Sequence, residues 1–355
     1  MNYALIGCGR IAPFHIKSAL DNHLAVMGLC DKDISKAQAL AKQFNLNPAV
    51  CYADFETMIR SIPAVDFVSI ATDSGSHHDI VMQAFGMNLN VLCEKPIALN
   101  LDDADEMIST AGKKGLIFGA CQQNRLNNAT IMVKKAVDAG AFGRISNAAV
   151  CIRWSRDRSY YANDSWRGTW ERDGGTLMNQ CIHGLDLMRY LAGPDIDYMY
   201  AILGNREHPY LPVEDIGIGV FKFRNGAVAT AEGTANVYKD NLEETLTIIG
   251  EKGTVKLGGQ VAERIDFWQF KDPDINSWKI ENQKFSSVYG DGHVRIFEDF
   301  KDAVCSHRQP FVDGQAGRNA LETVLAFYES YKTKEAVYFP LKHGSTLAMK
   351  GIQLT

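Results

Sequence analysis

The sequence predicts a two-domain α/β protein in which a parallel sheet comes first and a larger, mainly antiparallel sheet follows. The chain has 355 residues, which exceeds the size at which a single hydrophobic core stops growing. From residue 1 to 121, short apolar runs alternate with segments of helical period, as in βαβ units. After residue 121, strand-like segments recur with turn signals such as Asn225-Gly226, which favour antiparallel hairpins.

The first domain, residues 1–121, should contain five strands separated by helices. Expected strands are Tyr3–Ile6, Leu24–Cys30, Phe67–Ile70, Asn90–Cys93 and Leu116–Ala120. Expected helices are Ile11–Leu20, Ser35–Phe44, His77–Phe85 and Leu101–Gly112. Strands that alternate with helices in this way are typical of a doubly wound parallel sheet.

The second domain, residues 122–355, should be an α+β domain for substrate binding and oligomerisation. A helix is expected at Ala129–Ala139, and a late helix at about 316–332 is expected to pack back on the first domain. Expected strands are Ala148–Trp154, Ile216–Phe223, Ala227–Ala235, Thr245–Ile249, Thr254–Leu257 and Ile265–Phe270.

Composition excludes several classes of protein. The formal net charge is -5, and Lys and Arg do not cluster as a nucleic-acid footprint requires. Eight cysteines are scattered without a C-x-x-C pair, so neither a disulfide framework nor a zinc site is expected. The chain starts directly in a strand-like segment, and no apolar stretch is long enough to span a bilayer. We therefore expect a cytoplasmic protein without a metal, a membrane partner or a nucleic-acid partner.

A glycine motif follows the first strand. Gly7-Cys8-Gly9-Arg10-Ile11-Ala12 matches G-x-G-x-x-A, in which the glycines allow a tight turn and the approach of a pyrophosphate to a helix N-terminus. Asp31 ends the second strand, where a carboxylate accepts hydrogen bonds from the adenosine ribose. The order of these parts predicts a Rossmann domain. Asp31 favours NAD over NADP, although Lys32 leaves NADP open.

Two further segments carry candidate catalytic groups. Glu94-Lys95-Pro96 follows a strand end, where open α/β sheets present ligand groups. Lys95 could hydrogen-bond a substrate hydroxyl or accept its proton, and Pro96 permits a cis peptide; the alternative is a surface lysine beside a proline. Residues 174–186 form a glycine pair and a helical run that would place Asn179, His183 and Asp186 on one face. His183 is a candidate acid or base, and a buried structural histidine is the alternative.

These motifs together resemble the Gfo/Idh/MocA oxidoreductase family. The resemblance covers essentially the whole chain and includes Ala71-Thr72, Ser74 and His77. It implies that Lys95 and His183 act at the sugar carbinol that is oxidised. Asp73 departs from the pattern, because Thr-Pro is usual there.

Narrower features resemble a subgroup of this family, the UDP-N-acetylglucosaminuronate 3-dehydrogenases of the WlbA/WbpB type. They are Asn124-Arg125, Tyr160-Tyr161, Trp166 to Trp170, Asp173-Gly174-Gly175, Met178-Asn179-Gln180 and Asp313 to Arg318. The resemblance implies oxidation of a nucleotide-sugar C3 hydroxyl for bacterial surface polysaccharide, and a homotetramer or dimer. Four arginines could meet the uronate carboxylate or the diphosphate, namely Arg153, Arg156, Arg158 and Arg167. For Arg156 and Arg158 the alternative is a solvated basic loop.

The sequence and the resemblance together give the following candidate sites. The cofactor would contact Gly7, Gly9, Arg10, Ile11, Asp31, Lys32, Ala71, Thr72, Ser74, His77, Glu94, Lys95, Gln122, Trp166 and Arg167. The substrate would contact Lys95, Asn124, Arg125, Arg153, Tyr161, Arg167, Thr169, Asn179 and His183. The alternatives are an inositol or free-sugar dehydrogenase, a nucleotide-sugar 3-ketoreductase and an NAD-binding sensor.

Overall fold

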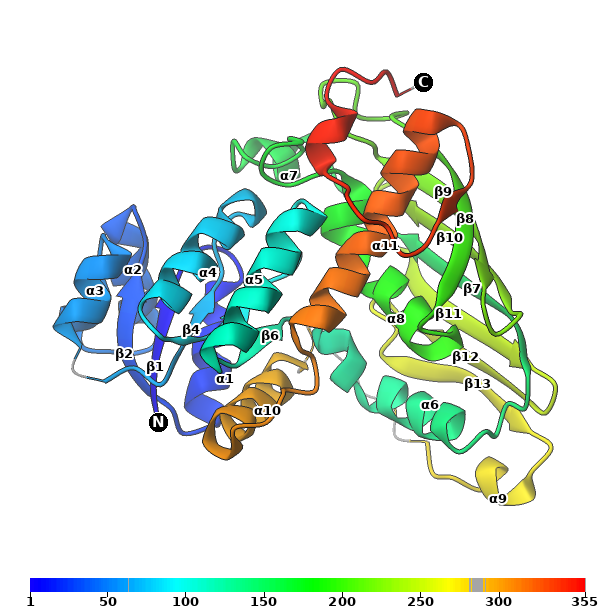
Figure 1. The fold of residues 1–355 in the computed structure, drawn as a ribbon, viewed down its shortest axis with the longest axis horizontal. Helices are drawn as coiled ribbons and strands as arrows, with labels where there is room; N and C mark the ends of the chain where they lie inside the picture. Colours follow the sequence, from blue (N-terminus) through cyan, green and yellow to red (C-terminus); the bar gives the residue numbers. More distant parts are fainter. Residues whose placement is uncertain (63, 281, 283–289, 291, 355) are drawn as a thin grey trace. The chain divides into compact units, whose positions relative to one another are not determined.

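The computed structural model describes residues 1–62, 64–280, 282, 290 and 292–354. The chain divides into two compact units (Figure 1). The first unit contains Met1–Ala98, Asp102–Gln123 and Asp291–Arg318. The second contains Leu99–Leu101, Asn124–Gly290 and Asn319–Thr355. Among the described residues, no helix is both long and apolar enough to cross a membrane.

A six-stranded parallel sheet forms the centre of the first unit. Its strand order is β3-β2-β1-β4-β5-β6, the order of a dinucleotide-binding sheet. The strands are β1 (Asn2–Ile6), β2 (Ala25–Cys30), β3 (Cys51–Tyr52), β4 (Phe67–Ile70), β5 (Asn90–Cys93) and β6 (Phe118–Ala120). β1 and β4 are buried almost throughout, as expected for parallel strands covered on both faces.

Helices follow most of these strands. They are α1 (Ala12–Asp21), α2 (Ile34–Gln43), α3 (Phe55–Ser61), α4 (His77–Gly86) and α5 (Leu101–Lys114). Asp33 and Asp54 cap α2 and α3 by accepting hydrogen bonds from Ser35 N and Thr57 N. The sequence prediction of a Rossmann domain is confirmed.

A helix from late in the chain completes the first unit. α10 (Gly292–Ser306) packs against α1, and Asn22 Nδ2 donates to the Val294 carbonyl at 2.9 Å. The ring of Phe297 lies 5.5 Å from that of Tyr3 and 6.2 Å from that of Phe67. Phe297 therefore covers the buried side chains of Tyr3 in β1 and Phe67 in β4, although it comes 294 and 230 positions later in the sequence.

An eight-stranded sheet forms the second unit. Its order is β13-β12-β11-β7-β10-β9-β8-β14, and β7 pairs with β10 in parallel while the other pairs are antiparallel. The strands are β7 (Ile145–Arg153), β8 (Ile196–Gly204), β9 (Ile216–Phe223), β10 (Val228–Thr234), β11 (Glu243–Gly250), β12 (Gly253–Gly258), β13 (Arg264–Phe270) and β14 (Val337–Tyr338). The predicted mainly antiparallel sheet is confirmed, including the hairpin at Asn225-Gly226.

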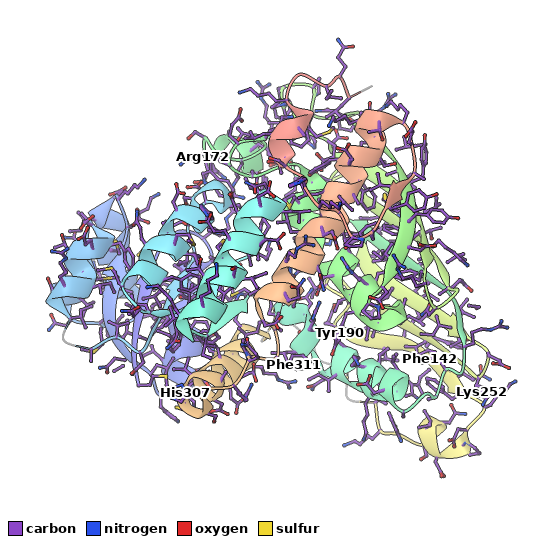
Figure 2. All side chains as sticks on the ribbon, viewed as in Figure 1. Phe142, Arg172, Tyr190, Lys252, His307 and Phe311 are labelled. Carbon is purple, nitrogen blue, oxygen red and sulfur yellow. The ribbon has the colours of Figure 1, made fainter. Side chains whose placement is uncertain are left out.

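Helices pack on this sheet and leave part of it open. They are α6 (Asn128–Asp138), α7 (Arg158–Ala162), α8 (Ile182–Ala192), α9 (Pro273–Asn276) and α11 (Gly314–Thr333), which begins in the first unit. α8 packs against β7 and β11. The buried ring of Phe142, which is labelled in Figure 2, meets that of Phe270 edge-on at 4.9 Å. β8 and β9 alternate buried with exposed residues, so their other face is exposed.

Candidate functional site

The glycine loop lies where the sequence predicts it, between β1 and α1. Gly7 has a φ of +95°, and a Cβ there would lie 2.5 Å from the Ala71 carbonyl carbon, so only glycine fits. A Cβ at Gly9 would meet no protein atom within 4 Å, which leaves that approach open to a pyrophosphate. Ile11, the N-cap residue of α1, makes no side-chain hydrogen bond to the helix, and the first turn of α1 carries no acidic residue. The loop therefore offers a helix N-terminus suited to an anion.

Asp31 connects the end of β2 to this loop. Its Oδ2 accepts a hydrogen bond from Cys8 N at 2.9 Å, and its Oδ1 accepts one from Asp33 N at 2.9 Å. Each carboxylate oxygen keeps a lone pair for a further donor. Asp31 is thus held in place with capacity left for ribose hydroxyls, while Lys32 and Arg10 are exposed beside it.

The predicted nicotinamide-side residues lie on loops that follow β4, β5 and β6. His77 is 1% exposed, and its Nδ1 donates to the Pro96 carbonyl at 2.7 Å while Nε2 lies 3.2 Å from the Thr72 carbonyl. Burial lowers the pKa of His77, against the opposing effect of the Pro96 contact. His77 therefore ties the loop after β4 to the Lys95-Pro96 segment, whose peptide bond is cis. Ala71, Ser74 and Gln122 are buried on these same loops.

A polar cluster marks the second unit, around the hydroxyl of Tyr160. That oxygen accepts hydrogen bonds from Arg167 Nη1 at 2.7 Å and Gln180 Nε2 at 3.0 Å. Asn179 accepts from Gln180 at 2.9 Å and donates to Asp173. The structure thus brings together Arg167 and Asn179, which the sequence predicted, with Tyr160, Gln180 and Asp173, which were not assigned to the site. The Tyr160-Tyr161 and Asp173-Gly174-Gly175 motifs were the sequence features from which Tyr160 and Asp173 could have been assigned to the site.

The helix that carries His183 starts irregularly. Leu177–Cys181 is a π-helix, and α8 continues from Ile182. The prediction that Asn179, His183 and Asp186 share one α-helical face was therefore wrong, because a π turn inserts a residue and rotates Asn179 relative to His183. Such turns occur frequently at functional sites. His183 itself is 8% exposed.

Several predicted substrate residues are engaged with other protein groups. Arg125 donates from Nε and Nη2 to Asp186 at 2.7 and 2.6 Å and lies over the ring of Tyr190, so Asp186 pairs with this guanidinium. Tyr161 is buried, and its ring lies 5.2 Å from that of His208.

Arg153 is not brought together with Asn179 and His183. Its guanidinium pairs with Glu232 and Glu243 at 2.5 and 2.7 Å. The neighbouring Ile152 side chain lies against Gly184 of α8, and successive strand residues point to opposite faces. Arg153 therefore lies on the sheet face that α8 does not cover.

Thr169, Trp166 and Asn124 complete the predicted set. Thr169 Oγ1 donates to the Trp166 carbonyl at 2.7 Å, and the Arg167 guanidinium lies 4.4 Å from the Trp166 ring centroid. Asn124 is 5% exposed. Trp166 and Arg167, predicted to reach the cofactor, belong to the second unit.

Comparison with known proteins decides the family. Residues 1–121 match the Gfo/Idh/MocA model described as an oxidoreductase family with an NAD-binding Rossmann fold, and residues 134–339 match the model of its C-terminal alpha/beta domain. The chain belongs to the Gfo/Idh/MocA oxidoreductase family. It is an NAD-dependent oxidoreductase.

Relatives within the Gfo/Idh/MocA family act on several sugars and polyols. Myo-inositol 2-dehydrogenase from Thermotoga maritima is 25% identical, over 95% of this chain and 98% of that protein. D-glucoside 3-dehydrogenase from Escherichia coli is 25% identical, over 94% and 96%. The WlbA dehydrogenase from Bordetella pertussis, whose crystal structure contains NADH and UDP-GlcNAcA, is 30% identical, covers 96% of this chain and 99% of its own, and superposes with a TM-score of 0.85.

A buried carboxyl group holds the start of the π turn in this Gfo/Idh/MocA protein. Glu214 Oε1 accepts from Leu177 N at 2.9 Å and from the Tyr328 hydroxyl at 3.1 Å. A Cβ at Gly175 would lie 1.7 Å from Glu214 Oε2, so this glycine makes room for the carboxyl group. Burial raises the pKa of Glu214 to about 8.

Glu214 should make the stability of the protein depend on pH. Its carboxyl group stays protonated in the folded state up to about pH 8, whereas the unfolded group ionises near its ordinary pKa. Ionisation therefore favours unfolding as the pH rises from about 5 to 8, and the effect is constant above that. We expect Glu214→Gln to gain up to about 4 kcal/mol in unfolding free energy relative to wild type over this interval.

Urea unfolding at pH 5 and pH 8 measures this difference. Glu207→Gln, at an exposed carboxylate in the same region of the chain, is the matched control and should track the wild type. Equal differences between Glu214→Gln and wild type at both pH values would show that Glu214 is ionised when folded.

Proposed function

We propose that the protein oxidises the C3 hydroxyl of UDP-N-acetylglucosaminuronate with NAD+, in the synthesis of bacterial surface polysaccharide. The proposal is supported by 30% identity to a WlbA dehydrogenase that binds this nucleotide sugar. It is also supported by the Asn179-Gln180 pair, which contacts Tyr160 at the start of the helix that carries His183.

The observation that carries the proposal is a pair of guanidinium groups around one phenol ring. Arg156 and Arg167 lie 5.0 and 4.6 Å from the Tyr160 ring centroid. Arg167 is 9% exposed, so its charge acts in a partly desolvated region where screening is weak. Arg167 Nε pairs with Asp164 at 2.9 Å, and Arg156 Nη1 donates to the Ser155 carbonyl and to Asn241. The other donors of these two planar cations suit a carboxylate or diphosphate.

In the proposed mechanism, Lys95 and His183 act on the same C3 hydroxyl. When bound, NAD+ supplies the hydride acceptor. One of the two residues removes the hydroxyl proton, and the other donates a hydrogen bond to the developing alkoxide. Asn179 and Tyr160 orient the sugar, and the glycine loop and Asp31 fix the dinucleotide, so that much of the rate comes from positioning.

Turnover with authentic substrate tests this function. Purified protein, NAD+ and UDP-N-acetylglucosaminuronate are mixed, and NADH absorbance is followed. A parallel assay contains 2-oxoglutarate as hydride acceptor and follows the 3-keto sugar by mass spectrometry, because NADH that stays bound would hide turnover. Oxidation of the uronate is expected. Absence of product in both assays would remove the substrate assignment.

Charge recognition separates this function from the nearest alternative, an inositol or free-sugar dehydrogenase. That alternative is supported by relatives at 25% identity. Arg156→Gln should raise KM for the uronate about tenfold or more, since charged hydrogen bonds contribute about 1.5–3 kcal/mol. Arg158→Gln, whose guanidinium lies over Tyr210, is the control. Oxidation of myo-inositol or free glucosides in preference to the uronate, unaffected by Arg156→Gln, would favour the alternative.

We further propose that the exposed face of the eight-stranded sheet mediates self-association. Ile202 pairs with Ile218, and Tyr200 with Val220, and these side chains are 38–65% exposed. Contiguous exposed apolar surface of this kind marks interaction sites.

Ile218→Arg should therefore lower the molar mass measured by light scattering after gel filtration. Leu347→Arg, at an exposed leucine outside the strands, should leave the mass unchanged. A monomeric wild-type protein would contradict the proposal.

We place the protein in the cytoplasm. All eight cysteines are free thiols, which is usual in a reducing compartment.

A further inference from the structure

The carboxylate of Glu94, directly before Lys95, is buried and surrounded by hydrogen-bond donors. Glu94 is 6% exposed. Its Oε1 accepts from His15 Nε2 at 2.9 Å and from His293 Nε2 at 3.1 Å. Its Oε2 accepts from Lys95 N at 3.1 Å. Three donors thus converge on one carboxylate from α1, α10 and the end of β5.

The donors are themselves held in order by a buried chain of hydrogen bonds. His15 Nδ1 lies 3.0 Å from Ser69 Oγ, which contacts the Tyr3 hydroxyl, and all three residues have no exposed surface. With Nε2–H donating to Glu94, Nδ1 accepts from Ser69, and Ser69 accepts from Tyr3. Every hydrogen bond along this chain then has a donor and an acceptor while His15 remains neutral.

Charge in this cluster resides on Glu94. Burial acts to raise the pKa of Glu94, but hydrogen bonds from His15 and His293 outweigh it and hold the pKa well below its usual range. Burial also lowers the pKa of His15. Glu94 is therefore a buried anion to which His15 donates as a neutral imidazole.

His15, Glu94 and His293 are residue types that bind metal ions, and their ligand atoms lie within 4.8 Å of one another. The nitrogen to oxygen distances of 2.9 and 3.1 Å are those of direct hydrogen bonds. They are shorter than the separation of about 3.3 Å between ligands bound at 2.0 Å to a tetrahedral ion. We therefore interpret the group as a clamp on Glu94.

The buried thiol of Cys121 is affected by both Glu94 and Lys95. Burial raises the pKa of this thiol most, Glu94 raises it further, and Lys95 lowers it. Both charges therefore act on the same buried sulfur atom. Glu94 also affects the pKa values of Tyr3, His15, His77 and Cys93.

We propose that Glu94, clamped by His15 and His293, is a positioning residue that fixes the Lys95 backbone and keeps the Lys95 ammonium charged. The inference rests on the proposed role of Lys95 in the oxidation. It assigns a function to α10, which brings His293 to β5 from 199 positions away in the sequence. Opposite charges at short range favour the charged form of each partner, so removal of the Glu94 charge should lower the pH at which Lys95 loses its proton.

Competitive labelling measures this directly and does not need enzymatic turnover. Wild type and variants at the same NADH concentration are exposed to trace acetic anhydride at a series of pH values, and acetylation of Lys95 is quantified by mass spectrometry. Glu94→Gln should shift the Lys95 labelling curve down by about one pH unit or more, which is about tenfold higher reactivity at a fixed pH below the midpoint. Glu94→Asp, which keeps the charge, should remain within about 0.3 units of wild type by the same argument.

Two further variants keep the test decisive. Glu106→Gln removes an exposed carboxylate that binds only a surface histidine, His78, among the contacts the structure records, and should not move the curve. His293→Ala loosens the clamp without removing the carboxylate and should raise Lys95 reactivity about two- to fivefold, as expected for a weakened ion pair; it serves if Glu94→Gln does not fold. Unchanged labelling in a folded Glu94→Gln, or in His293→Ala when that variant alone folds, would overturn the proposal. If Glu94→Gln shifts the Lys95 labelling curve but the wild-type protein oxidises no sugar, the proposed role of Glu94 would stand and the dehydrogenase function would be rejected.

Discussion

Replacing Lys95 with methionine should lower kcat for sugar oxidation about 100- to 10,000-fold, the usual contribution of a group that transfers or holds a proton in the transition state. Methionine keeps much of the length and the apolar stem of lysine. Because the proposed dinucleotide contacts of Gly7, Gly9 and Asp31 come from segments other than that of Lys95, NADH affinity should change less than about threefold. Steady-state kinetics and NADH fluorescence titration measure the two quantities.

The control for this substitution is Lys36→Met, at an exposed lysine of α2, which should leave both quantities unchanged. His183→Asn should also reduce kcat about 100-fold or more with intact NADH binding. A Lys95→Met protein with nearly full activity would remove Lys95 from the chemistry, and retained cellular function without turnover would favour the NAD-binding sensor.

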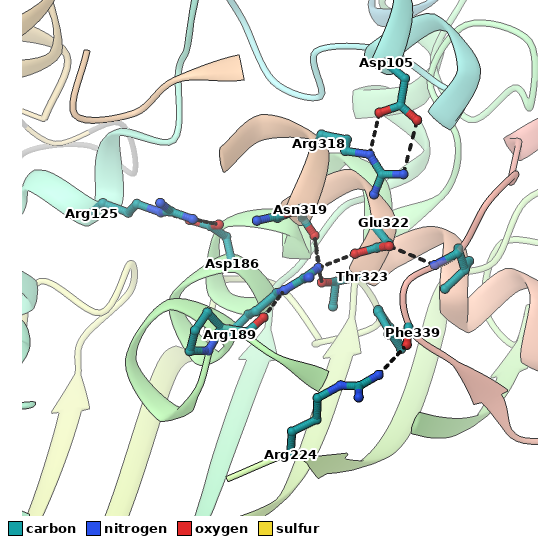
Figure 3. Close-up of polar contacts among 12 residues, drawn as sticks. Asp105, Arg125, Asp186, Arg189, Arg224, Arg318, Asn319, Glu322, Thr323 and Phe339 are labelled. Atoms are coloured by element: carbon teal, nitrogen blue, oxygen red, sulfur yellow. Dashed lines mark hydrogen bonds and ion pairs between the residues drawn. The ribbon is translucent and has the colours of Figure 1, made fainter. Parts of the chain in front are cut away.

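Replacing Glu322 with alanine should lower the unfolding free energy by about 3–5 kcal/mol, because it leaves a buried guanidinium without its counter-charge. Arg189 Nη1 donates to Glu322 Oε2 at 2.7 Å and to the Asn319 carbonyl at 2.8 Å. Glu322 Oε1 also accepts from Leu341 N at 2.9 Å. These contacts connect α8, α11 and the segment after β14 within the second unit (Figure 3).

A second ion pair in Figure 3 provides the control. Arg318 Nε donates to Asp105 at 2.6 Å in the first unit, where Asp105 is 47% exposed. Asp105→Ala should reduce stability by less than about 1 kcal/mol, as is usual for pairs with access to water. Urea unfolding followed by circular dichroism compares the two variants. A loss in Glu322→Ala no larger than in Asp105→Ala would show that the interior accommodates an unpaired Arg189.

Local sequence pattern was sufficient for most strands near the cofactor loop. Phe67–Ile70 and Asn90–Cys93 are predicted with their observed ends, because each is a short apolar run with clear boundaries. β8 was not predicted because its exposed face also carries apolar side chains, those of Tyr198, Tyr200 and Ile202. The usual alternation of apolar and polar residues along a strand is therefore absent from its sequence. α10 was also not predicted, although Ile296, Phe300 and Ala303 have helical spacing and are buried.

The parts of the site that could be predicted are those in which a residue's role depends on residues next to it in the sequence. Gly7 and Asp31 act through a turn and a strand end, and both lie as expected. Arg125 and Arg153 have their partners 61 and 79 positions away, so no local pattern shows that carboxylates already bind them. The π turn at Leu177–Cys181 likewise depends on Glu214 and tertiary packing, which helical periodicity does not encode.

The contribution of α10 to the first unit has a consequence for how the protein is made. Residues 1–123 emerge from the ribosome long before His293 and Phe297 have been synthesised. The aromatic rings of Tyr3 and Phe67, which Phe297 contacts in the folded protein, therefore stay uncovered during most of translation. The N-terminal domain therefore matures only when the nascent chain is nearly complete, and a gene truncated at the apparent domain boundary would encode an aggregation-prone fragment.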